Sequence, residues 1–195
     1  MDTTDLRDAK DTTDRNGSVA AATSVAAIEQ MDFVGEFGDT EASVPAWLRS
    51  RRITGALAGL YRKRSERGSC VVISELPDST GQEERRIDLF VMFLWNMHGQ
   101  KRIAYEVKVS RADFLSEIRH PEKRAFALSV SNEYYFVTPP GLVRPSEIPE
   151  EAGLVEVSSS GVRVKRKAPF RVTERPPWYF VAALVRAATR LTPIP

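Results

Sequence analysis

Two apolar stretches that both carry charged residues decide the fold: residues 86–94 read RIDLFVMFL and residues 103–109 read IAYEVKV. Both are rich in strand-forming residues, and residues 96–99 (NMHG) between them are typical of a hairpin loop. An unpaired carboxylate in a buried strand is costly, so charges at such positions need a compensating partner. The sequence therefore predicts a β-hairpin that carries a charged site, with a divalent cation as the simplest partner for its carboxylates.

The positions of Asp88 and Glu106 predict that they face each other across this hairpin. They are symmetric about Met97, so a three- or five-residue loop centred there would pair them. Opposed residues on one face have Cβ atoms about 4.5–5.5 Å apart, close enough to share one hard cation. Lys108 lies on the same face as Glu106, because strand side chains alternate. A two-residue turn would instead shift the register and move Asp88 to the other face.

The composition indicates one globular domain preceded by an acidic extension. The chain has 195 residues and a net charge of +2, but residues 1–41 carry ten acidic and three basic side chains, a net charge of −7. That leaves +9 for residues 42–195. We expect 1–41 to be a disordered acidic tail, because it has few large apolar side chains. We expect 42–195 to form a single domain whose positive charge favours an anionic partner such as nucleic acid.

Cysteine content and hydropathy indicate a cytoplasmic protein without a membrane segment. Cys70 is the single cysteine, so the chain cannot form an internal disulfide. No stretch of the sequence approaches the roughly 18 apolar residues of a membrane-spanning helix. The first residues also lack the basic and then apolar pattern of a secretory signal.

Further helices and strands are expected on either side of the hairpin. Ser43 and Pro45 predict the start of a helix, since apolar residues then recur at helical spacing to about residue 64. Ser110 and Asp113 have the spacing of a capping box that begins another helix. Strands are predicted at 69–76, 133–138, 154–157 and 162–167, and further helices from 121 and over 176–191. The expected fold class is α/β, a mixed central sheet flanked by helices, with a C-terminal hairpin and helix.

The order of these motifs resembles the PD-(D/E)XK nuclease superfamily, and within it the MmcB-type DNA-repair group. The resemblance rests on the order of four features: an Asp on one strand, a Glu-x-Lys motif on the strand paired with it in the hairpin, then a helix, and then a further strand. The matching residues are 86–88 (RID), 105–110 (YEVKVS), 112–114 (ADF), 121–123 (PEK), 135–139 (YFVTP) and 148–154 (IPEEAGL). The match covers about half of the chain, and Ile87 replaces the proline of the motif's name. It implies a restriction-endonuclease-like core and a metal-dependent nuclease that hydrolyses phosphodiester bonds of DNA in repair or processing.

In this interpretation Asp88, Glu106 and Lys108 are the catalytic residues. The two carboxylates and the Val107 carbonyl would bind Mg²⁺ or Mn²⁺, since hard ions prefer oxygen ligands. Glu75, at the end of the strand before the hairpin, is the candidate for a further metal ligand. Lys108 would position the attacking water and stabilise the developing negative charge. It would act as a general base only if burial lowered its pKa.

Each of these charged groups also has a purely structural interpretation. Taken alone, Glu106 and Lys108 are typical of a solvent-facing ion pair worth at most about 1 kcal/mol. His98 and His120 have no partner at metal-binding spacing and are expected to be structural. Six basic residues are candidates for nucleic-acid contacts, with a solvated surface as the alternative: Arg52, Lys123, Arg124, Arg163, Lys165 and Lys167.

The predicted partner is DNA, with a second copy of the chain or a repair protein as a further one. The alternative function is a catalytically inactive nuclease-fold module that binds DNA or a protein partner.

Overall fold

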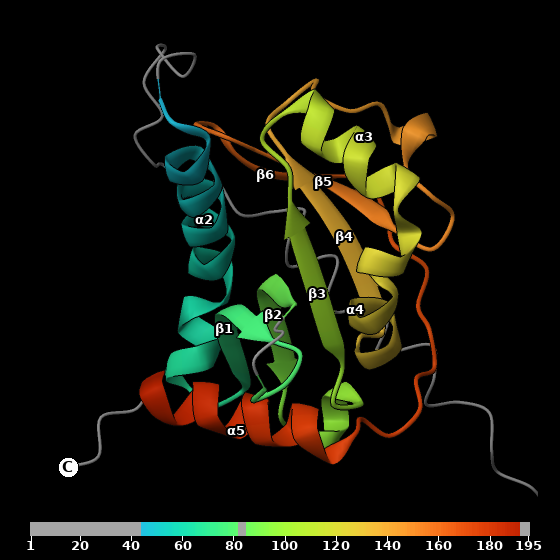
Figure 1. The fold of residues 1–195 in the computed structure, drawn as a ribbon. Coiled ribbons are helices and arrows are strands. Elements are labelled where there is room, and N and C mark those ends of the chain that lie inside the picture. The colour runs from blue at the N-terminus through green and yellow to red at the C-terminus, as the bar shows by residue number, and fades with distance from the viewer. Residues whose placement is uncertain (1–43, 82–84, 192–195) are drawn as a thin grey trace, which may run out of the picture.

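The computed structural model describes residues 44–81 and 85–191 (Figure 1). The tail predicted at 1–41 lies outside these residues. Helix α2 (Ala46–Glu66) comes first, and Pro45 occupies its N-cap without a side-chain hydrogen bond. The predicted cap, Ser43, is also outside the described residues. No helix in the described ranges is both long and apolar enough to cross a membrane.

The charged hairpin follows α2 after one preceding strand. Strand β1 (Cys70–Pro77) leads to β2 (Arg86–Phe93) and β3 (Arg102–Val107). The connection between β2 and β3 contains a short 3-10 helix, Asn96–His98. The predicted strands are therefore present, with ends shifted by one or two residues.

The second half of the chain alternates helices and strands before it ends in a hairpin and a helix. Ser110 caps α3 (Arg111–Arg119), and its side chain accepts a hydrogen bond of 3.2 Å from the backbone N–H of Asp113, as the capping pattern predicts. The remaining elements are the 3-10 helix Pro121–Lys123, α4 (Ala125–Val130), β4 (Glu133–Thr138), the 3-10 helix Pro145–Glu147, β5 (Gly153–Ser158), β6 (Gly161–Arg166) and α5 (Trp178–Leu191).

The strands form one six-stranded mixed sheet in the order β1-β2-β3-β4-β5-β6. β3, β4 and β5 are parallel to one another, whereas the β1–β2, β2–β3 and β5–β6 pairs are antiparallel. α3 and α4 form the crossover that a parallel β3–β4 pair requires. The predicted fold class, an α/β mixed sheet with a C-terminal hairpin and helix, is confirmed.

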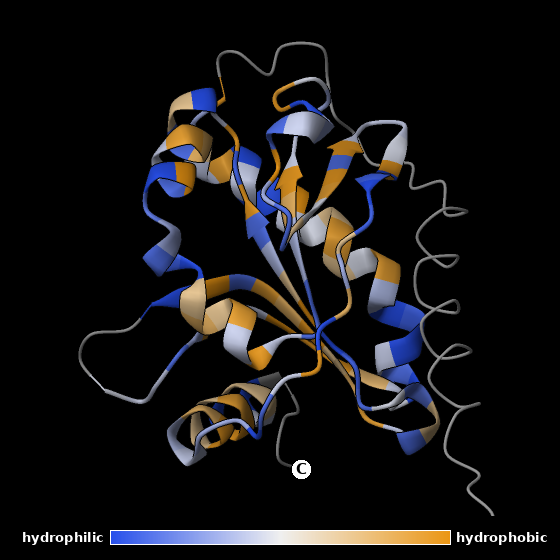
Figure 2. Cartoon of the chain, turned by 90° about the vertical axis from the view of Figure 1, so that its right-hand side faces the viewer, coloured by the Kyte–Doolittle hydropathy of each residue, from blue (hydrophilic) through white to orange (hydrophobic). Residues whose placement is uncertain are grey.

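Each face of the sheet has its own hydrophobic core. On one face α2 buries Leu57 against Tyr105 and Tyr135. On the other, α3, α4 and α5 cover Phe90 and Phe136. Figure 2 shows hydrophobic residues gathered on the strands and on the helix surfaces that face them. The charged residues of β2 and β3 lie on the second face, because their side chains alternate with those buried under α2.

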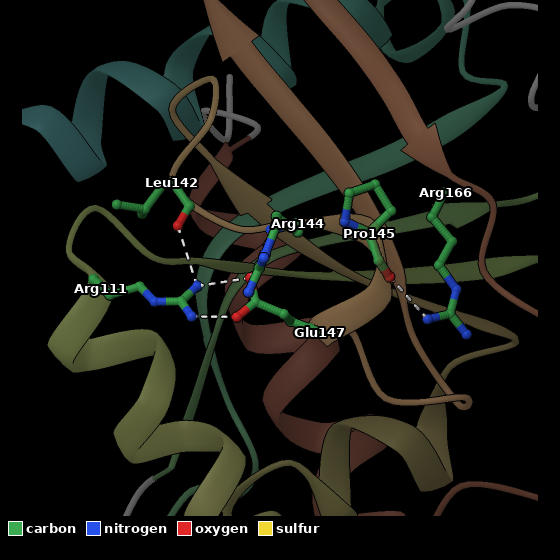
Figure 3. Close-up of polar contacts among 6 residues, drawn as sticks. All are labelled: Arg111, Leu142, Arg144, Pro145, Glu147 and Arg166. Atoms are coloured by element: carbon green, nitrogen blue, oxygen red, sulfur yellow. Dashed lines mark hydrogen bonds and ion pairs between the residues drawn. The ribbon is translucent and has the colours of Figure 1, made fainter.

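A cluster of polar contacts fixes α3 against the connection between β4 and β5 (Figure 3). Arg111, at the start of α3, makes a two-pronged contact with the carboxylate of Glu147 and donates a hydrogen bond of 3.3 Å to the Leu142 carbonyl. The Arg111 guanidinium and the backbone N–H of Arg144 lower the pKa of Glu147 to about 2. Arg166 on the β6 side donates a hydrogen bond of 3.2 Å to the Pro145 carbonyl. These contacts hold the helix that carries the acidic neighbours of Lys108.

Candidate active site

The register of the hairpin brings Asp88 and Glu106 together. Leu89 pairs with Tyr105, and the same offset continues over the other paired residues of β2 and β3. Extended by one position, it places Asp88 opposite Glu106, as predicted. The connection at 94–101 is longer than the predicted loop, but the strand pairing remains symmetric about Met97.

The carboxylate of Asp88 is anchored to the backbone of the next strand. Its Oδ2 accepts a hydrogen bond of 2.7 Å from the N–H of Val107. Burial raises the pKa of Asp88 to about 6, since the Val107 hydrogen bond opposes this effect only in part and the negative charge of Glu75 adds to it. Asp88 is therefore held in place by one oxygen while its charge is poorly compensated.

Glu106 is bonded to Lys108 and repelled by Asp88. Its Oε1 lies 2.8 Å from Nζ of Lys108, and its side chain is 20% exposed. Burial is the main cause that raises the pKa of Glu106 to about 7, and the neighbouring Asp88 charge is the second. A carboxylate whose pKa is raised by burial and by a neighbouring carboxylate is typical of functional sites.

Lys108 lies at the centre of an acidic cluster. Its Nζ contacts Glu106 and also lies 3.5 Å from carboxylate oxygens of Asp113 and Glu117, both on α3. Burial alone would lower the pKa of Lys108, but the carboxylates led by Glu106 outweigh it and raise the pKa above its usual value. The condition for a general base, a lowered pKa, is therefore not met. The raised pKa favours the protonated, positively charged form of Lys108.

Glu117 is a site residue that the sequence interpretation missed. Only 6% of its surface is exposed, which is unusual for a glutamate, and its carboxylate faces Lys108. It lies three residues after the buried Phe114 and therefore on the same face of α3. A charged residue on the apolar face of a helix was the signal available in the sequence.

Glu75 lies at the outer end of the same row of carboxylates. The register of β1 with β2 places it opposite Asp88, at the one position of the ladder where the pairing is interrupted. Its φ of 53° is in the left-handed region, which a non-glycine residue adopts at a cost of about 1–2 kcal/mol. Backbone strain of this kind is concentrated at functional sites.

The donors present fit a hard divalent cation held by Asp88 and Glu106. Both groups offer carboxylate oxygens, and each has one oxygen outside the hydrogen bonds just described. The Val107 carbonyl points to the same side of β3 as its N–H, toward Asp88. Within residues 44–81 and 85–191, no three His, Cys, Asp or Glu side chains are grouped closely enough to hold a metal ion together. As placed, Glu75 therefore does not join Asp88 and Glu106 in a common ligand set.

A cavity of about 480 Å³ opens beside Glu106 between the sheet and the helices. Its lining combines acidic and basic side chains: Arg85, Arg86, Glu106, Glu117, Glu122, Lys123 and Arg124. Tyr134 also lines it, and the buried hydroxyl of Tyr134 has no hydrogen-bond partner among the described residues. This cavity therefore offers positive charge and an unused polar group next to the carboxylates.

The predicted nucleic-acid contacts are only partly brought to this cavity. Lys123 is exposed and lines the cavity, consistent with an anion contact. Arg124 lines it too, but its side chain is buried and donates hydrogen bonds to Glu151 (2.7 Å) and to the Glu117 carbonyl (3.2 Å). The Arg124 guanidinium therefore holds the lining of the cavity together and is not part of a solvated surface.

The other basic candidates lie away from the carboxylates. Arg52 belongs to α2, which covers the opposite face of the sheet. Arg163 and Lys165 are on β6, which β4 and β5 separate from β3, and Lys167 follows that strand. Nζ of Lys165 lies 3.8 Å from Glu156. The structure does not bring these four residues together with Asp88 and Glu106.

Comparison with known proteins establishes the fold but no family. No family model matches the chain, and no curated protein matches it. Among solved structures, the chain is similar to SPO1766 from Silicibacter pomeroyi, a protein of unknown function, with a TM-score of 0.53 and 19% sequence identity. The similarity covers 73% of this chain and 85% of that protein. The two share an α/β fold.

Proposed function

We propose that this protein is a metal-dependent nuclease of the PD-(D/E)XK type that hydrolyses phosphodiester bonds of DNA, with Asp88, Glu106 and Lys108 as its catalytic residues. One observation carries the proposal: two partly buried carboxylates face each other on β2 and β3, and a buried lysine contacts one of them. The resemblance in motif order supports the same chemistry. The single cysteine, Cys70, supports a cytoplasmic location.

Each residue has a distinct part in this reaction. A bound Mg²⁺ or Mn²⁺ would polarise the phosphoryl oxygen and lower the pKa of water. Asp88 and Glu106 would hold the ion, and the Val107 N–H fixes the orientation of Asp88. Lys108 orients Glu106 and presents a fixed positive charge to the negative charge that develops on the phosphate. The raised pKa of Lys108 favours this electrostatic role over removal of the proton from the attacking water.

The cavity supplies a place for the substrate phosphate beside these groups. Lys123 and the arginines at 85 and 86 line it together with Glu106. Positive side chains at such a position attract the phosphate backbone without reading the base sequence. The proposed substrate is therefore DNA recognised through its backbone or shape.

The test is cleavage of labelled single-stranded, duplex and branched DNA with and without Mg²⁺ or Mn²⁺. Asp88→Asn and Glu106→Gln keep the size of each side chain and remove its charge, and Lys108→Met removes the cation. We expect each variant to reduce the cleavage rate by at least about 100-fold, because the groups act on the transition state. Glu122→Gln is the matched control, since Glu122 is an exposed carboxylate of the same cavity.

The results separate a nuclease from a binding module. Metal-dependent cleavage that the three variants lose and Glu122→Gln keeps would support the proposal. Absence of cleavage on all three substrates, with salt-sensitive DNA binding equal in the wild type and the variants, would favour the inactive nuclease-fold module.

A further inference from the structure

A groove of about 940 Å³ runs along the free edge of β1, away from the proposed catalytic cluster. α2 forms one wall and α5 the other, as the two helices cover opposite faces of the sheet (Figure 1). β1 is the first strand of the sheet, and within the described ranges no strand pairs with its outer edge. The groove thus lies where the next strand of the sheet would be.

The backbone at the floor of this groove offers hydrogen bonds. The backbone N–H of Leu94 donates a hydrogen bond to the Ser69 carbonyl. The backbone N–H and C=O groups of Ser69, and of every second residue after it, therefore point toward β2. The N–H and C=O groups of Val72 and Ser74 therefore point away from β2 and into the groove. Pro77, without an N–H, closes the end of this edge in the way that natural edge strands are protected.

The walls leave room for an extended chain. Gly55, Ala58 and Gly59 line the α2 wall, and Ala183 and Ala187 line the α5 wall. A Cβ added at Gly55 would meet no atom within 4 Å. In a second copy of the protein, β1 would also lie between α2 and α5, and these helices would meet the groove walls. A single extended segment therefore fits the groove better than the sheet edge of a second copy does.

Charge identifies the kind of segment that would bind. Four arginines line the groove, Arg62, Arg86, Arg186 and Arg190, against two glutamates, Glu66 and Glu75. The chain itself contains an acidic segment with the alternation of a strand, residues 31–37 (MDFVGEF). Met31, Phe33 and Phe37 fall on one side of it, and Asp32 and Glu36 on the other.

The segment is also close enough along the chain to reach the groove. Eight residues, 38–45, lie between Phe37 and Ala46, and the nine Cα–Cα steps from Phe37 to Ala46 span up to ~30 Å when extended. The groove residues of α2 begin at Gly55 and end at Glu66, ~14–30 Å from Ala46 along the helix axis. The connection is therefore long enough to place the segment beside β1.

We propose that residues 31–37 bind in this groove as an added strand on the edge of β1, with their apolar side chains between α2 and α5 and their carboxylates near the groove arginines. The principle is strand addition, in which main-chain hydrogen bonds supply the affinity and side-chain pockets supply the specificity. The acidic N-terminal region would then complete the sheet rather than only increase solubility.

The test is amide hydrogen exchange of the full-length protein, followed at the N–H groups of Val72 and Ser74. The double variant Phe33→Pro with Val34→Pro prevents residues 31–37 from pairing, because one of two consecutive N–H groups of an added strand must face β1 and proline lacks this donor. We expect both amides to be protected in the wild type and to exchange at least about tenfold faster in this double variant. Ala21→Pro is the matched control, since it places proline in the same acidic region outside the segment, and it should leave exchange unchanged.

Three results would overturn the proposal. The first is rapid exchange of both amides in the wild type, and the second is equal protection in the wild type and in the double proline variant. The third is protection that appears only at high protein concentration or only after a DNA oligonucleotide is added, which would assign the groove to a second copy or to nucleic acid. The amide of Leu89 on the central strand β2 reports that each variant is folded.

Discussion

Two buried lysine–glutamate pairs on opposite faces of the same sheet differ in how well their charges are balanced. On the α2 face, Nζ of Lys101 lies 2.5 Å from Glu133, whose other carboxylate oxygen accepts a hydrogen bond from the Tyr135 hydroxyl. On the α3 face, Nζ of Lys108 lies 2.8 Å from Glu106. The two pairs are similar in geometry, but their surroundings differ in a way that agrees with a structural role for the first and with the proposed functional role for the second.

The surroundings shift the pKa values of the two lysines in opposite directions. Burial lowers the pKa of Lys101, and the carboxylate of Glu133 acts against this effect. The pKa of Lys108 is raised, because Glu106, Asp113 and Glu117 together outweigh burial. The α3 face therefore holds an excess of negative charge. A divalent cation would relieve this excess.

The largest expected effect is the loss of the α2 pair. Lys101→Met leaves Glu133 buried without its ammonium partner, and we expect a loss of about 3–5 kcal/mol in the free energy of unfolding. Urea denaturation at pH 7 measures it. The double variant Lys101→Met with Glu133→Leu should recover most of the loss, since a buried ion pair can be replaced by apolar residues. A loss below about 1 kcal/mol in the single variant would contradict a structural role for the pair.

Asp88→Asn should stabilise the protein at alkaline pH. The pKa of Asp88 is raised to about 6 in the folded state, so ionisation disfavours folding, and stability is lost as the pH rises from about 4 through 6. The asparagine cannot ionise and can still accept the hydrogen bond from Val107. We expect a gain of about 1–3 kcal/mol at pH 8 that shrinks toward pH 4. Thermal unfolding of the wild type and Asp88→Asn between pH 4 and pH 8, without divalent metal, measures this gain. A variant less stable than the wild type at pH 8 would contradict an excess of negative charge on the α3 face.

A smaller effect is expected at Glu75, where the backbone rather than the charge is unfavourable. Glu75→Gly and Glu75→Ala both remove the carboxylate, but only glycine relieves the left-handed φ of 53°. We expect the glycine variant to be about 1 kcal/mol more stable than the alanine variant. Denaturant unfolding of the two proteins side by side measures this difference. Equal stabilities would show that Glu75 is not strained in solution.

The hairpin register and the ends of most elements could be predicted because they depend on local pattern. Asp88 and Glu106 are symmetric about the loop centre, so the pairing followed from arithmetic and strand alternation. Ser110 is similarly local, since its capping bond reaches only Asp113. A longer loop did not disturb the register, because the apolar faces of β2 and β3 fix it.

The features that could not be predicted depend on contacts between distant parts of the chain. Glu117 is buried because α3 packs over Lys108, and Arg124 is buried because Glu151, 27 residues away, accepts its hydrogen bonds. The basic residues of β6 were predicted beside the substrate. They lie apart because β4 and β5 are inserted between β3 and β6, a strand order that local patterns do not specify.

The central claim is that the charge excess on the α3 face forms a divalent cation site, and calorimetric titration with Mn²⁺ tests it most directly. The wild type should bind one Mn²⁺ through Asp88 and Glu106. Binding should weaken as the pH falls below about 7, where protons compete for Glu106. Asp88→Asn and Glu106→Gln should abolish this binding, whereas Glu122→Gln should retain it. Absence of Mn²⁺ binding at pH 8, or equal binding by Asp88→Asn and the wild type, would contradict the claim.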